Sequence, residues 1–71
     1  MPLKGKPLTE VEKLVIEWVC VGKTTDEIGM ILGKAGGTIK RQLQNIYEKL
    51  DCHDRASAAV KYTKQKYGIT E

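Results

Sequence analysis

The chain has 71 residues, of which 30% are charged, and it contains one Trp and no Phe. A chain of this length buries only about 60% of the surface that it exposes when unfolded, so we expect one small domain with a thin core. This size argues against a deep catalytic cleft or cofactor cavity, and we predict neither an enzyme nor a bound cofactor. No apolar run approaches the length of a membrane span, so no membrane partner is expected.

Positive charge is concentrated in the second half of the chain. Residues 34–71 carry eight bases against four acids, whereas residues 1–33 carry four bases against five acids. The net charge of +3 therefore belongs to the second half. This asymmetry indicates either a polyanionic partner there or a basic surface that is merely solvated.

The two cysteines do not form a pattern typical of a metal site. Cys52 and His53 are adjacent, but two Cys and one His without C-x-x-C spacing make a poor zinc site, so no metal is predicted. Cys20 lies in an apolar helical run, where we expect it to be buried. The composition suits a reducing compartment and the N-terminus lacks the apolar region of a signal peptide, so we expect a cytoplasmic protein.

Two capping boxes mark the first two helices. Thr9 and Glu12 begin the first helix, which is expected to end at Gly22. Thr24 and Glu27 begin the second helix in the same way, and Gly33 is expected to stop it after about two turns. The buried faces of these helices are predicted from their helical spacing and contain Val11, Leu14, Val15, Trp18, Val19 and Val21 in the first and Ile28, Ile31 and Leu32 in the second.

Two further helices are predicted in the second half. The third, about 36–50, starts within 35–38 and has an apolar face at spacings of four, three and four residues. The fourth, about 55–67, begins after Asp54 and stops at Gly68. The apolar face of the third helix comprises Ile39, Leu43, Ile46 and Leu50, and the inner side of the fourth is expected to comprise Ala56, Ala59, Val60, Thr63 and Tyr67.

The predicted fold is therefore all-α, with four helices and short links. Residues 1–7, which hold two Pro and two Lys, are expected to form a flexible N-terminal arm. Residues 8–69 are expected to form the single domain.

The second and third helices carry the offsets of a helix-turn-helix. Such a motif needs a small residue where the helices cross, a glycine in the turn and an apolar plug between the helices, and Gly29, Gly33 and Ile39 supply them. The outer face of the third helix is then the face that enters the major groove of DNA. The predicted base contacts on this face are Lys40, Arg41 and Gln44.

The third helix starts with the sequence Ala35-Gly36-Gly37, which lacks a capping side chain. Small residues allow backbone N–H groups to approach a phosphate closely, at the expense of about 1 kcal/mol of helix stability for each glycine. Gly37 and Thr38 are therefore predicted phosphate contacts, with Asn45 as a further candidate. The alternative is that this stretch is only a wide turn and that the bases after it are a solvated face.

Several spaced motifs resemble the LuxR/GerE-type helix-turn-helix domain, over about residues 8–69. They include "LTEVEKLVIEWVCVGKTTDEIGMILG", "TIK" and "NIYEKLDCHDRASAAV". The resemblance implies a bacterial transcription regulator that binds double-stranded DNA as a dimer at inverted repeats, with the dimer contact on the fourth helix. It implies phosphate contacts at the start of the second helix, on Lys23, Thr24 and Thr25. The expected dimer contacts on the fourth helix are Ala58, Lys61, Tyr62 and Gln65.

Other interpretations remain open from the sequence. A protein-interaction module could bind another regulator through its fourth helix, and the weak start of the third helix favours this alternative. RNA polymerase is a further candidate partner, whereas RNA is disfavoured because the chain lacks an aromatic stacking surface. Arg55 is expected to form an ion pair with Glu12 or Glu27, and Tyr47 either covers the core or contacts a phosphate.

Overall fold

The computed structural model describes residues 3–68, which form four helices and no strand. The helices are α1 (Glu10–Val21), α2 (Thr25–Leu32), α3 (Gly36–Leu50) and α4 (Arg55–Tyr67). The predicted all-α fold is confirmed. Within the described residues, no helix is long and apolar enough to cross a membrane.

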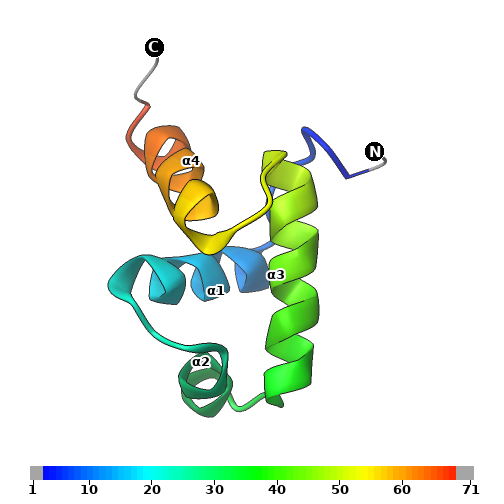
Figure 1. The fold of residues 1–71 in the computed structure, drawn as a ribbon, viewed down its shortest axis with the longest axis vertical. Helices are drawn as coiled ribbons and strands as arrows, with labels where there is room; N and C mark the ends of the chain where they lie inside the picture. The colour runs from blue at the N-terminus through cyan, green and yellow to red at the C-terminus, as the bar shows by residue number, and fades with distance from the viewer. Residues whose placement is uncertain (1–2, 69–71) are drawn as a thin grey trace.

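The longest helix, α3, organises the molecule (Figure 1). Helix α1 crosses its middle, α2 lies at its N-terminal end, and α4 packs against α1 and α3. The core lies between α1 and α3, where Val15, Ile16, Ile39 and Ile46 are fully buried.

Local signals set the helix ends as predicted. Both capping boxes are formed, with the hydroxyls of Thr9 and Thr24 accepting from the N–H groups of Glu12 and Glu27 at 3.2 Å. Gly22 and Gly33 end α1 and α2 in the left-handed conformation that favours glycine.

The buried faces of α1 and α2 are narrower than the spacing predicted. Leu14, Val21 and Ile31 are 51%, 67% and 46% exposed, and Cys20 is exposed although it was expected to be buried. A domain this small has too few elements to cover every apolar position. Trp18 packs against the core as predicted, although it is only partly buried.

The N-terminal segment contacts the end of α3. The Gly5 N–H donates to the Lys49 carbonyl at 3.1 Å, and Lys4 pairs with Asp51 at 3.3 Å. Residues 3–7 thus have defined contacts where a flexible arm was expected. Residues 1–2 and the predicted domain boundary at residue 69 lie outside the described part of the chain.

Candidate nucleic-acid interface

The crossing of α2 and α3 depends on the absence of a side chain at Gly29. A Cβ atom there would lie 2.5 Å from the backbone oxygen of Lys34, which is far inside van der Waals contact. Gly33 turns the chain at a φ of 69°, and Ile39 is fully buried against the pair. The three positions therefore have the roles that the helix-turn-helix spacing predicted.

The N-terminus of α2 presents the first group of predicted phosphate contacts. Lys23 and Thr25 are half-buried and Thr24 is exposed. The Thr24 N–H donates to the Glu27 carboxylate at 2.9 Å, and this hydrogen bond is the main cause that lowers the pKa of Glu27. The Thr24 hydroxyl accepts from the Glu27 N–H and keeps its own O–H to donate to an anion.

The N-terminus of α3 has no side-chain cap, as the sequence predicted. Ala35 is the N-cap, and its carbonyl accepts from the N–H groups of Thr38 and Ile39. The first N–H groups of a helix have no partner within it, and at Gly37 a Cβ atom would meet nothing within 4 Å. The helix nevertheless begins at Gly36, near the early limit of the predicted range.

The predicted base contacts lie together on the outer side of α3. Lys40, Arg41 and Gln44 are all exposed, and none of their side chains forms a hydrogen bond or ion pair with another residue of the described segment. Thr38 is exposed and Asn45 is half-buried on the same helix. The side chains that would contact DNA are therefore available for an outside partner.

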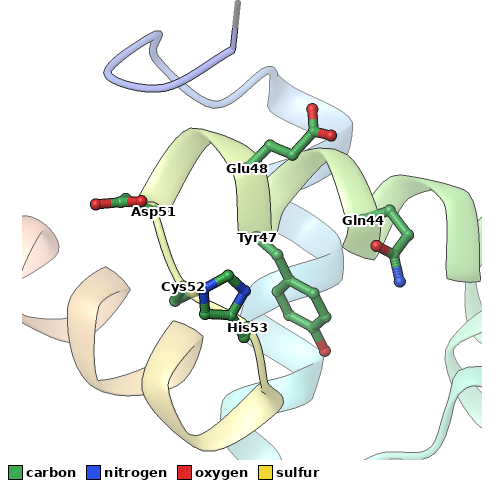
Figure 2. Close-up of a pocket in the computed structure, with 6 residues that line it drawn as sticks. All are labelled: Gln44, Tyr47, Glu48, Asp51, Cys52 and His53. Carbon is green, nitrogen blue, oxygen red and sulfur yellow. The ribbon is translucent and has the colours of Figure 1, made fainter. Parts of the chain in front are cut away.

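The two ends of α3 differ in charge. The bases Lys40 and Arg41 lie near its N-terminus, whereas its last turn carries Glu48 and Lys49 and is followed by the C-cap Asp51. Glu48 and Asp51 line an open hollow of about 240 Å³, shown in Figure 2, together with Gln44, Tyr47, Cys52 and His53. Because the C-terminal end adds no net positive charge, the N-terminal half of α3 is the half better suited to enter a groove.

The side chains that line the hollow in Figure 2 do not form a metal site. Cys52 is buried and His53 is exposed, and burial raises the pKa of the Cys52 thiol, which disfavours the thiolate that binds metals. Over residues 3–68, no group of three His, Cys, Asp or Glu side chains is placed to hold an ion.

Comparison with known proteins identifies the family. Residues 6–62 match GerE, described as the luxR family of bacterial regulatory proteins. The chain belongs to the luxR family. Membership supports DNA-binding regulation of transcription, and the family is not a class of enzyme.

Two relatives of this luxR-family chain are regulators of transcription. It is 40% identical over 55 residues to the transcriptional regulatory protein DesR of Bacillus subtilis (strain 168), covering 78% of this chain and 28% of that protein. It is 37% identical over 54 residues to the transcriptional activator protein AnoR of Acinetobacter nosocomialis, covering 76% of this chain and 23% of that protein. The chain thus spans about a quarter of the length of these relatives.

The structure corrects the expected orientation of α4 in this luxR-family domain. Ala58 was expected at a dimer contact but is fully buried, and Tyr62 packs against the core and donates to Glu17 at 2.6 Å. Burial, and then the Glu17 hydrogen bond, raises the pKa of Tyr62 to about 12. The reason is steric, because the small Ala58 side chain allows α4 to pack closely against its neighbours.

Two further residues of α4, Val60 and Tyr67, also differ from the sequence prediction, whereas the predicted dimer contacts Lys61 and Gln65 lie at the surface. The Lys61 amine donates to the carbonyls of Leu50 and Asp51 at 3.0 and 2.8 Å, so it caps the end of α3. Gln65 is exposed as its predicted role requires. Val60 and Tyr67 were expected on the inner side but are 54% and 67% exposed.

Arg55 has a different partner from the one expected. Its Nη2 atom donates to the backbone carbonyl of Lys23, not to a glutamate. Glu12 instead pairs with Lys49 at 2.6 Å. A base in the first turn of a helix is unfavourable to the helix dipole, and this misplaced charge is the sequence signal that could have pointed to a distant partner for Arg55.

Proposed function

We propose that this domain binds double-stranded DNA sequence-specifically as part of a transcription regulator, with the N-terminal half of α3 in the major groove. The observation that carries the proposal is the group of exposed, unpaired side chains of Lys40, Arg41 and Gln44 beside a helix start that has no side-chain cap. The family match and the regulatory relatives support it.

Phosphate contacts would come from the two helix N-termini. Lys23, Thr24 and Thr25 at α2 and Gly37 and Thr38 at α3 supply N–H, hydroxyl and ammonium donors, with Asn45 as a further donor on α3. Such contacts would supply much of the affinity and make it salt-dependent. The base contacts would supply the sequence preference.

Selection from a randomised duplex pool at moderate salt tests the proposal directly. Enrichment of an inverted repeat would support a dimer that reads sequence and would give the half-site spacing. Retention that depends on salt but enriches no sequence would contradict sequence-specific binding. It would favour instead the protein-interaction module, with another regulator bound through α4.

Replacing Arg41 or Lys40 with Ala is expected to weaken binding to the selected duplex by about 1–3 kcal/mol if the side chain contacts a base. The preference at the contacted base pair should relax as well. Fluorescence anisotropy with the selected duplex and its single-base variants measures both effects. The control is Lys13→Ala, which removes an exposed base on α1, outside this surface. Equal losses in the control and the test variants would contradict base contacts.

We further propose that two copies pair through the exposed side of α4, centred on Val60. Ala56, Thr63 and Lys64 lie three or four residues from Val60 and line shallow hollows with it. This face replaces the one predicted from the sequence, because Ala58 and Tyr62 belong to the core.

Val60→Glu is expected to leave the fold intact and to abolish cooperative binding of two copies to an inverted repeat, because it buries an unpaired charge in the proposed dimer contact. Sedimentation of the protein–DNA complex and gel-shift stoichiometry measure the effect. Leu14→Glu introduces the same charge at a 51% exposed apolar residue of α1, outside both proposed surfaces, and serves as the control. If two copies of the Val60→Glu variant still bind cooperatively, this face of α4 is not the dimer contact.

A further inference from the structure

The link between Arg55 and Lys23 joins two parts of the fold that otherwise have little contact. Arg55 is the first residue of α4, and Lys23 lies in the turn between α1 and α2, 32 residues earlier. Helix α2 packs chiefly against α3, while α4 packs against α1 and α3. The guanidinium of Arg55 therefore supplies a direct connection from α4 to the turn that leads into α2.

The turn at Lys23 is held from both of its backbone groups. The Lys23 N–H donates to the Trp18 carbonyl at 3.0 Å, and the Lys23 carbonyl accepts from Arg55. The next residue, Thr24, is the N-cap of α2. Holding Lys23 on both sides thus fixes where the N-terminus of α2 points.

We infer that Arg55 is a positioning residue for DNA binding, which holds the N-terminus of α2 where Lys23, Thr24 and Thr25 can meet the phosphate backbone. This inference rests on the proposed function, because it assigns a support to the phosphate contacts proposed there. Arg55 is half-buried, and its guanidinium already donates to a backbone carbonyl. Its role is therefore to orient the donors at the N-terminus of α2. The first residue of the proposed dimer helix is thereby connected to a phosphate-binding turn.

Arg55→Met tests the inference, because methionine keeps an unbranched apolar stem and removes the donor. Affinity for the selected duplex is measured by anisotropy over a series of salt concentrations, at a temperature where circular dichroism shows each variant folded. Affinity is expected to fall about tenfold, and the slope of log K against log salt to decrease by about one phosphate contact or more. Arg55→Lys can still donate to the Lys23 carbonyl, so it should retain most of the affinity and most of the salt slope.

Two further variants separate positioning from other roles. Lys66→Met removes one positive charge at the far end of α4 and controls for net charge. Lys23→Ala combined with Arg55→Met tests coupling, since a positioning role predicts that Arg55→Met has a smaller effect once one of the donors that it positions, the Lys23 side chain, is gone.

The outcomes are distinct. If the affinity losses of Lys23→Ala and Arg55→Met simply add in the double variant, Arg55 acts independently of Lys23. If the salt slope of Arg55→Met is unchanged, Arg55 has a role in stability alone. Either result would overturn the inference while the wild-type chain still binds DNA. If the wild-type chain binds no duplex at any salt concentration, the proposed function is refuted. The inference about Arg55, which rests on that function, is then refuted as well.

Discussion

Lys49→Met is expected to lower the free energy of unfolding by about 3–5 kcal/mol, which is the usual effect of removing one partner from a buried ion pair. Lys49 and Glu12 meet at 2.6 Å with side chains that are 9% and 4% exposed. The same Glu12 carboxylate accepts from the Thr9 N–H at 2.9 Å. Without Lys49, a buried carboxylate would keep one backbone donor and lose its cation. Urea denaturation followed by circular dichroism measures the change.

Two comparisons make the Lys49 prediction specific. Lys13→Met breaks the exposed pair with Glu10, at 3.7 Å, and should change stability by less than about 1 kcal/mol. Glu12→Gln added to Lys49→Met should recover part of the loss, because no buried charge then remains unpaired. If Lys49→Met were as mild as Lys13→Met, the pair between α1 and α3 would not be a stabilising link.

Gly29→Ala is expected to destabilise the domain by about 1–3 kcal/mol, the typical effect of overpacking. The added methyl group would lie 2.5 Å from the Lys34 carbonyl oxygen, and that backbone atom belongs to the turn that leads into α3. Relief of the clash would move α3 relative to α2, so binding to the selected duplex should weaken as well. Thermal unfolding and anisotropy measure the two effects.

Gly37→Ala is the matched control for the effect of Gly29→Ala on stability. A Cβ atom at Gly37 meets nothing within 4 Å, and alanine is the better helix former, so this variant should be more stable by about 1 kcal/mol. The same substitution therefore has opposite expected signs at two glycines of one motif. Destabilisation of similar size at both positions would contradict the assigned role of Gly29.

Local sequence signals determined the helices and the motif. Capping boxes at Thr9 and Thr24 and glycines at 22, 33 and 68 mark helix ends through hydrogen bonds and backbone conformations that involve neighbouring residues only. The offsets of Gly29, Gly33 and Ile39 specified the crossing of α2 and α3 in the same local way. These features are confirmed because no distant part of the chain is needed to form them.

The sequence was less informative for α4. Small and apolar residues occur on more than one side of this helix, so its pattern fits two orientations, and the prediction placed Val60 inside and Ala58 outside. Close packing of α4 on α1 and α3 reverses this, because Ala58 is small enough for the contact and Tyr62 reaches Glu17. The proposed dimer face could not be located without that packing.

The sequence by itself determined the four helices, the helix-turn-helix and the exposed bases on α3, since each depends on the spacing of residues within one helix or across two consecutive helices. Only the tertiary structure decided the partners of the charged side chains. Arg55 meets Lys23, Lys49 meets Glu12 and Lys61 meets Leu50 across ten or more residues. Several acids and carbonyls could have accepted each base, and the packing of the helices selects one by bringing it within reach.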